Sequence, residues 1–275
     1  MSIEPKKDAH SIVHELWETY QNVSQKNFQE AYNDAVSFKE QSASLFNLGI
    51  IDLTTRAYCD DLFWGAMAKI YSLAQETDYV SEDLKGLPKL LSDTFYCNFS
   101  IFQSLPDAWA LNHHFPIIPI HRLDEKPTQN ATLADLTCDS DGKIDEFIDI
   151  RKVRDTLKLH DPNGEPYYLG TFLVGAYQEI LGDLHNLFGD TNAVHLTVED
   201  DGSYNLTHHV EGDTVRQVLE YVEYDCNELV RRVRKSTEAA LKSGSMTLEQ
   251  SAQFVRRFQE GLSGYTYLEG LKPEL

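Results

Sequence analysis

The chain has 275 residues, of which 44 are acidic and 24 basic, so its formal net charge is −20. Proteins that bind nucleic acid through its phosphates need a clustered basic surface, and this composition argues against that class of partner. No stretch approaches the roughly 20 apolar residues of a membrane-spanning helix, and the polar N-terminus has no apolar signal core. We therefore expect a folded, cytoplasmic protein of one or two domains.

The first 93 residues carry the spacing of amphipathic helices. Apolar side chains recur on one face over residues 12–20, 28–38 and 54–71. Gly49 is placed to end the second of these helices. A shorter helix is predicted from Ser81 to Asp93. Together these segments predict a helical bundle over residues 1–93.

From Thr94 onward the pattern changes to short strands. Aromatic and β-branched residues predict strands over 95–102, 117–120, 132–137 and 167–174. Alternating apolar residues over 194–207, interrupted by an acidic turn with Gly202, predict a β-hairpin.

Helix signals return near the C-terminus. Thr214 is a predicted N-cap, an amphipathic segment over 227–242 stops near Gly244, and Thr247 with Gln250 forms a capping-box pattern. The chain therefore predicts an α+β fold, with a helical bundle at 1–93 and a mostly antiparallel β domain with C-terminal helices at 94–275.

The candidate metal-binding motifs lack ligand residues at the positions that a metal site requires. If Gly142 were the turn glycine of a calcium loop, Thr137 and Ile148 would stand where carboxylates are required. His10 and His14 lie four residues apart on a predicted helix, but the zinc-protease pattern HExxH is absent. We predict no metal site from these residues.

Cys138 differs from the other cysteines because it ends a predicted strand and precedes Asp139 and Asp141. Four widely spaced cysteines are too few for a disulfide framework, so each is expected to be a free thiol. The residues alone leave two interpretations of Cys138. It is either a buried side chain beside a polar turn or a proton donor in an acidic pocket.

Six ordered runs of this sequence closely resemble the biosynthetic arginine decarboxylases of bacteria. The runs are FSIFQSLPDAWA at 99–110, PIHRLDEKPT at 119–128, LTCDSDGKID at 136–145, GAYQEILG at 175–182, HNLFGDT at 185–191 and GYTYLE at 264–269. That family is similar to the ornithine and diaminopimelate decarboxylases, which are dimeric pyridoxal-phosphate enzymes with an alanine-racemase-like barrel followed by a β domain.

The resemblance implies a place for each part of this chain. Residues 1–93 would be a bundle inserted between barrel and β domain, and residues 94–210 would form much of the β domain. The barrel, which carries the Schiff-base lysine, the glycine-rich phosphate loop and the acid that pairs with the pyridine nitrogen, is not recognisable in this chain.

The resemblance also implies residue roles. Cys138 matches the cysteine that reprotonates Cα after CO₂ leaves, a role that a thiol with a pKa near neutrality can fill. Asp139 matches the acid that binds the distal cation of the substrate across the dimer interface. Asp141 has no such match and is either a further substrate-binding residue or a cap of the turn. A carboxylate suits a guanidinium because that group is a fixed cation with a forked donor face. Tyr177 matches the tyrosine that contacts the cofactor phosphate.

By this resemblance the chain is part of an enzyme that converts L-arginine to agmatine and CO₂ for polyamine synthesis. The implied partners are the barrel, L-arginine and further copies in a homo-oligomer. The implied cofactors are pyridoxal phosphate, shared with the barrel, and magnesium as a second one to test. Two alternatives stay open: a non-catalytic module that binds and regulates an intact decarboxylase, and a fragment without activity.

Overall fold

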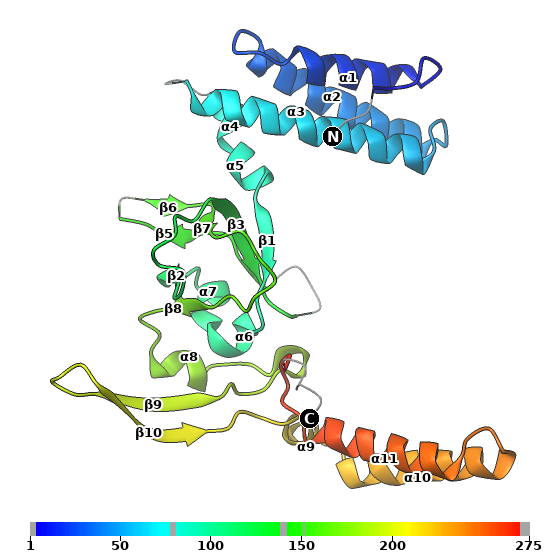
Figure 1. Ribbon diagram of the computed structural model, residues 1–275, viewed down its shortest axis with the longest axis vertical. Coiled ribbons are helices and arrows are strands. Elements are labelled where there is room, and N and C mark those ends of the chain that lie inside the picture. The colour runs from blue at the N-terminus through cyan, green and yellow to red at the C-terminus, as the bar shows by residue number, and fades with distance from the viewer. Residues whose placement is uncertain (1–3, 78–80, 138–141, 151, 270–275) are drawn as a thin grey trace. The chain divides into compact units, whose positions relative to one another are not determined.

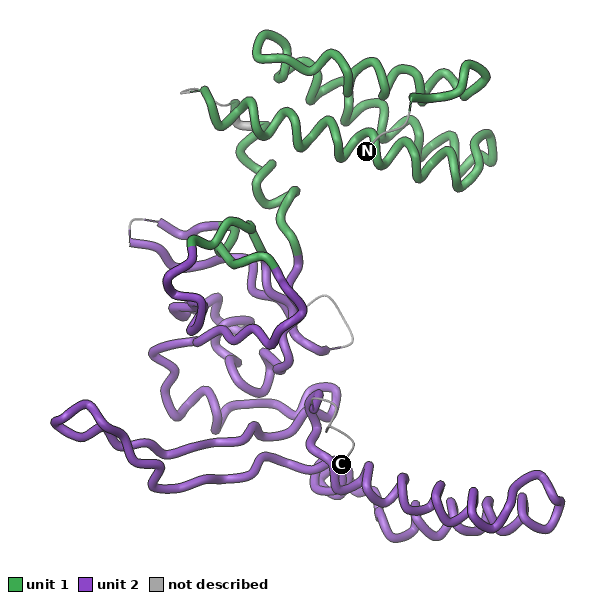
Figure 2. Tube along the Cα trace, viewed as in Figure 1, with its two compact units in different colours: residues 1–93, 126–131, 155–161 green, residues 94–125, 132–154, 162–275 purple. Residues whose placement is uncertain are grey.

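A computed structural model of the chain describes residues 4–77, 81–137, 142–150 and 152–269. The chain divides into two compact units (Figure 2), one made of residues 1–93, 126–131 and 155–161 and the other of residues 94–125, 132–154 and 162–275. None of the helices in the described part is long and apolar enough to cross a membrane.

The first unit is built on three long helices that pack against one another (Figure 1). These are α1 (Ser11–Asn22), α2 (Phe28–Asn47) and α3 (Leu53–Gln75), and all three confirm the helices predicted from apolar spacing. Their facing sides form one buried core, which includes Ile12, Leu16, Ala35, Leu62, Met67 and Ile70.

Local capping explains where these helices begin and end. The His10 Nδ1 atom accepts a hydrogen bond from the Ile12 amide at 3.2 Å, and an Asp52 oxygen accepts one from the Thr55 amide at 2.8 Å. Gly49 lies just after α2 with a φ of +71°, a conformation that favours glycine. His10 therefore acts as a helix cap in this fold.

The predicted helix over 81–93 is divided in two. The structure has α4 (Glu82–Lys85) and α5 (Leu87–Leu90), with Gly86 between them. Pro88 lies in the first turn of α5, and because it has no amide hydrogen it cannot continue the hydrogen-bond ladder of α4.

In the described part of the chain, the strands pair in four small sheets. The largest has the order β1-β3-β4, from β1 (Asp93–Tyr96), β3 (Gln129–Ala134) and β4 (Lys143–Ile144), with β7 (Leu157–Leu159) also paired to β3. The remaining pairs are β2 (Ile117–Pro119) with β8 (Leu169–Thr171), β5 (Phe147–Ile148) with β6 (Val153–Arg154), and β9 (Ala193–Val198) with β10 (Tyr204–Val210). The registers of β3 with β4 and β7, and of the last three pairs, are antiparallel, which confirms the α+β class.

The strand predicted over 95–102 is partly wrong. Strand β1 stops at Tyr96, and residues Ile101–Ser104 form helix α6, followed by α7 (Pro106–Ala110). The Ser100 hydroxyl accepts a hydrogen bond from the Gln103 amide at 3.4 Å, which starts a helix that aromatic composition alone does not indicate.

The C-terminal part confirms the predicted hairpin and helices. After α8 (Ala176–Ile180) and the short 3₁₀ helix η1 (His185–Leu187), the hairpin β9–β10 leads to α9 (Val215–Tyr221), α10 (Cys226–Ser243) and α11 (Leu248–Leu262). Thr214 and Thr247 form complete capping boxes at the starts of α9 and α11. Gly244 ends α10 in the left-handed conformation.

Candidate active site

Asp135 follows directly after strand β3 and is buried, with only 4% of its surface exposed. Its Oδ1 atom accepts hydrogen bonds from the Thr137 amide at 2.9 Å and from the Thr137 hydroxyl at 2.6 Å. Its Oδ2 atom accepts a third from the Ile101 amide at 2.9 Å, at the start of α6. Both oxygens of this buried carboxylate are therefore satisfied by protein donors.

The backbone of Asp135 makes a further connection to Gly142. The Asp135 amide donates to the Gly142 carbonyl oxygen at 2.7 Å. A Cβ atom added at Gly142 would overlap both the Asp135 carboxylate and the Thr137 hydroxyl, so a larger residue at this position would have to displace them. One residue thus holds both Thr137 and Gly142, which flank residues 138–141.

Three predicted site residues fall between these flanking positions. Cys138, the predicted catalytic thiol, and the predicted substrate-binding residues Asp139 and Asp141 lie outside the described residues. Sequence reasoning missed Asp135, although an acid placed directly after a strand and two residues before Thr137 was visible in the printed sequence.

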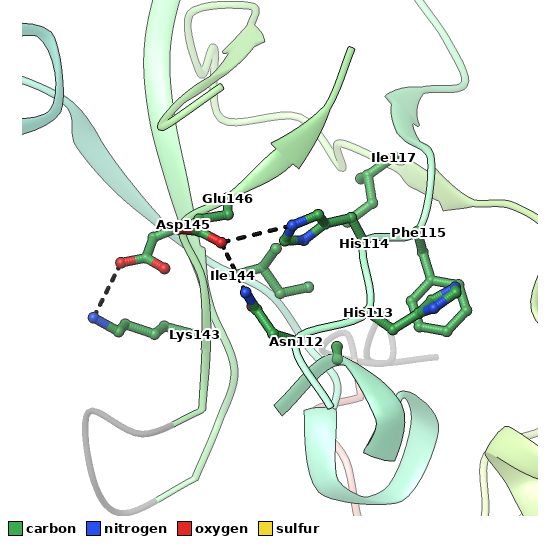
Figure 3. Close-up of a pocket in the computed structure, with 10 residues that line it drawn as sticks. Asn112, His113, His114, Phe115, Ile117, Lys143, Ile144, Asp145 and Glu146 are labelled. Carbon is green, nitrogen blue, oxygen red and sulfur yellow. Dashed lines mark hydrogen bonds and ion pairs between the residues drawn. The ribbon is translucent and has the colours of Figure 1, made fainter. Parts of the chain in front are cut away.

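Residues beyond Gly142 pack against the segment that follows α7 (Figure 3). A Glu146 carboxylate oxygen accepts a hydrogen bond from Asn112 at 3.1 Å and lies 3.6 Å from the His114 Nε2 atom. The Lys143 ammonium pairs with Asp145 at 3.1 Å. Asn112, His114, Lys143, Asp145 and Glu146 all line one pocket (Figure 3).

A thiol also lies close to Asp135. Burial, with the negative charge of Asp135 as a smaller cause, raises the pKa of the Cys97 thiol to about 11. Cys97 is therefore a neutral thiol at physiological pH, and it is not a competing nucleophile or acid of the kind expected at Cys138.

Tyr177, the predicted phosphate contact, lies on α8 and is 75% exposed. The helix is anchored by its neighbour Gln178, which is buried and exchanges two hydrogen bonds with Asp107. The Asp107 amide donates to Gln178 Oε1 at 3.1 Å, and Gln178 Nε2 donates to an Asp107 oxygen at 2.6 Å. Among the described residues, none makes a hydrogen bond or ring contact with the Tyr177 phenol.

A phenol hydroxyl can donate a hydrogen bond to a phosphate oxygen, which is the contact that the sequence predicts for Tyr177. Tyr177 belongs to a run of exposed apolar side chains that follows β8, with Phe172, Leu173, Val174, Ile180 and Leu181 at least 43% exposed. This run therefore leaves several large apolar side chains in contact with solvent on the described part of the chain.

Two family models match this chain. The arginine decarboxylase helical bundle domain matches residues 6–88, and the arginine decarboxylase C-terminal helical extension matches residues 215–268. The first covers α1 to α4 and ends within α5, and the second covers α9 to α11.

Curated relatives and a solved structure agree with these models. The biosynthetic arginine decarboxylase of Gloeobacter violaceus is 52% identical over 269 residues, which are 96% of this chain and 42% of the relative. That of Bacteroides thetaiotaomicron is 49% identical over 263 residues, 95% of this chain and 42% of the relative.

The crystal structure of the biosynthetic arginine decarboxylase from Campylobacter jejuni is 30% identical with a TM-score of 0.79, and the match covers 98% of this chain and 43% of that one. The chain thus spans about two fifths of the length of the relatives it matches. Both domain models, the sequence relatives and the solved structure lead to one conclusion: nearly the whole chain matches the C-terminal part of the biosynthetic arginine decarboxylases.

Proposed function

We propose that this chain supplies catalytic and substrate-binding residues to an arginine decarboxylase whose cofactor-binding barrel lies outside these 275 residues. The observation that carries the proposal is the 52% identity to a named decarboxylase over 96% of the chain. The run that contains Cys138 and Asp139 is complete, and both positions that flank it are held by the buried Asp135.

The proposed reaction removes CO₂ from L-arginine and replaces it with one proton at the same carbon, which gives agmatine. Cys138 donates that proton from its thiol, and the thiolate regains a proton from solvent. Asp139 accepts hydrogen bonds from the substrate guanidinium, and Asp141 is a further candidate for this contact. Pyridoxal phosphate, when bound, supplies the electron sink for the loss of CO₂, and Tyr177 would contact its phosphate.

The exposed apolar run from Phe172 to Leu181 supports the docking of the barrel on this part of the chain. Tyr177 lies in the middle of that run on a helix fixed by Gln178 and Asp107. A barrel that covered this surface would bring its cofactor phosphate to the Tyr177 phenol while it buried the apolar side chains.

The test is complementation. We would measure CO₂ release from L-arginine with this chain alone, with the barrel portion of a relative alone, and with the two mixed in the presence of pyridoxal phosphate. Release only in the mixture supports the proposal. No release in the mixture, together with inhibition of an intact decarboxylase by this chain, would support the regulatory alternative instead.

Substrate binding is tested by Asp139→Asn in the same mixture, with Asp200→Asn as the matched control. Asp200 lies in the exposed turn of the β9–β10 hairpin. Loss of a charge-assisted contact predicts a KM for arginine raised about tenfold or more for Asp139→Asn and unchanged for Asp200→Asn. An unchanged KM in both would contradict the role proposed for Asp139.

A further inference from the structure

Helix α8, which carries Tyr177, is only five residues long. Helices shorter than about 12 residues are marginal in water by themselves, so the place of α8 depends on the parts of the fold that hold it. Gln178 is its one buried residue, with 5% of its surface exposed, whereas Tyr177 beside it is 75% exposed. Whatever holds α8 therefore acts through Gln178 or through the ends of the helix.

The Gln178 side chain attaches α8 to α7 by both of its polar atoms. Its Oε1 atom accepts a hydrogen bond from the Asp107 amide at 3.1 Å, and its Nε2 atom donates to the Asp107 carboxylate at 2.6 Å. Asp107 lies in the first turn of α7, where an amide has no acceptor within its own helix. The Gln178 side chain therefore satisfies a free backbone donor and a carboxylate at once, and the bond to the carboxylate is of the stronger, charge-assisted kind.

A second attachment follows the C-terminal end of α8. The Asp183 amide donates to the Phe102 carbonyl oxygen at 3.0 Å, and Phe102 lies in a buried hydrophobic cluster that includes other residues of α6. A Cβ atom added at Gly182 would overlap the Gln103 carbonyl oxygen, so the two backbones approach closely here. Helix α8 is thus held to the α6–α7 pair at Gln178 and again just beyond its last turn.

We infer that Gln178 is a positioning residue for cofactor binding, one that acts through Asp107 to fix the place of the Tyr177 phenol; this inference rests on the proposed function. A phenol bonds a phosphate oxygen only at about 2.5–3.0 Å, so a shift of α8 by about 1 Å would break the contact. Gln178 and Tyr177 are consecutive in the helix, so a bond that holds one side chain also holds the backbone that carries the other. Gln178 touches neither cofactor nor substrate in this account.

Two variants change the contact between Gln178 and Asp107 and leave the net charge of the chain as it is. Gln178→Leu removes both hydrogen bonds and keeps an apolar side chain in the buried position. The swapped pair, Gln178→Glu combined with Asp107→Asn, exchanges donor and acceptor, because the carboxylate now accepts from the side-chain amide and still accepts from the backbone amide. Glu179→Gln is the control on the same helix, since Glu179 is exposed and its side chain makes no hydrogen bond or ion pair among the described residues.

The first measurement needs neither cofactor nor barrel. Hydrogen exchange at the Leu181 and Asp183 amides, which donate at 3.0 Å to the carbonyl oxygens of Tyr177 and Phe102, reports how firmly α8 is held. We expect Gln178→Leu to speed exchange at both amides by about tenfold or more, and the swapped pair to keep the parent rate. A parent rate in Gln178→Leu would overturn the inference, because α8 would then be held without Gln178.

The second measurement compares pyridoxal phosphate with pyridoxal, which lacks the phosphate, in the complemented enzyme. Absorbance titration should give a Kd for pyridoxal phosphate that Gln178→Leu raises about tenfold, as Tyr177→Phe does, and that the swapped pair and Glu179→Gln leave unchanged. The Kd for pyridoxal should stay at the parent value in every variant. General damage to the fold would raise both constants or lower the number of binding sites, and this result in Gln178→Leu would refute a positioning role.

A double-mutant cycle determines whether Gln178 acts through Tyr177. If it does, Gln178→Leu has no further effect on the Kd for pyridoxal phosphate once Tyr177→Phe is present. If the two effects multiply instead, Gln178 acts independently of the phenol and the inference is wrong.

Failure of the proposed function gives a different result from failure of the inference alone. A mixture that binds neither form of the cofactor would show that the chain does not complete an enzyme, and an unchanged Kd in Tyr177→Phe would show that the phosphate contact is absent; either result overturns the inference as well. If Tyr177→Phe raises the Kd for pyridoxal phosphate and Gln178→Leu does not, the phosphate contact stands and only the positioning role of Gln178 is wrong.

Discussion

Asp107 and Gln178, which are 71 residues apart, exchange two hydrogen bonds that fix helix α8 against helix α7. Gln178 is 5% exposed while its neighbour Tyr177 is 75% exposed. These two adjacent residues of one short helix therefore lie in different surroundings, one buried and one exposed. Gln178 anchors α8, and Tyr177 is left exposed to solvent on the described part of the chain.

Replacing Gln178 by Leu should therefore destabilise the second unit. The change leaves the Asp107 amide and carboxylate without their partner, at an expected cost of about 1–3 kcal/mol in the free energy of unfolding. Gln253→Leu is the control, because Gln253 lies exposed on α11 with no side-chain bond among the described residues. Urea unfolding followed by circular dichroism measures both, and equal stabilities would contradict the anchoring role.

Gly142→Ala should also destabilise the protein, because the added methyl group overlaps the Asp135 carboxylate and the Thr137 hydroxyl. Overpacking at a buried position costs about 1–3 kcal/mol. Gly261→Ala in α11 meets nothing within 4 Å, and in a helix alanine is favoured over glycine by up to about 1 kcal/mol. We expect thermal unfolding to shift down for the first variant and not for the second. If the unfolding temperatures of both variants shifted in the same direction, the side chains around Gly142 would be able to move and accept the added methyl group.

The thiols of Cys59 and Cys97 should be unreactive in the folded protein. Burial raises the pKa of each to about 11, with the charges of Arg56 and Asp60 as smaller influences on Cys59. At pH 8 a thiol with a pKa two units above the ordinary value has about one hundredth of the usual thiolate, and only the thiolate reacts. Site-resolved alkylation with iodoacetamide should therefore be at least about 100-fold slower at these residues than in the urea-unfolded chain.

The same shifts predict how stability changes at high pH. The unfolded chain ionises these thiols near pH 9 and the folded chain near pH 11. No stability is lost below pH 9, where the thiols are neutral in both states, and stability falls as the pH rises from about 9 to 11. Cys59→Ala should show a smaller fall over that range than the parent chain. An identical fall would mean that the Cys59 thiol does not contribute.

Elements with local signals were predictable from the sequence. The hairpin β9–β10 follows from alternation and an acidic glycine turn, and the starts of α9 and α11 follow from Thr214 and Thr247 with their capping partners. The helix α6 was not predictable in this way. Its start depends on Asp135, which lies 34 residues further along the chain, so aromatic composition favoured a strand there.

The candidate site shows the same difference between residues that local sequence signals and residues that long-range contacts determine. Cys138, Asp139 and Tyr177 were predicted through the family resemblance of their runs, and Asp141 through its place beside them, because a residue type and its neighbours are visible in sequence. The part played by Asp135 was not visible, since it depends on hydrogen bonds to residues that lie before and after it and in another helix. Long-range polar contacts of this kind have no periodic signature.

The central claim, that Cys138 is the proton donor of an arginine decarboxylase, is tested most directly by one substitution. We would compare CO₂ and agmatine formation by the complemented enzyme carrying Cys138→Ala with that carrying Cys97→Ala, in which a half-buried thiol next to the site is removed instead. Loss of a general acid predicts a kcat for agmatine lowered about 100-fold or more for Cys138→Ala and nearly unchanged for Cys97→Ala. Full turnover to agmatine by Cys138→Ala would contradict the account.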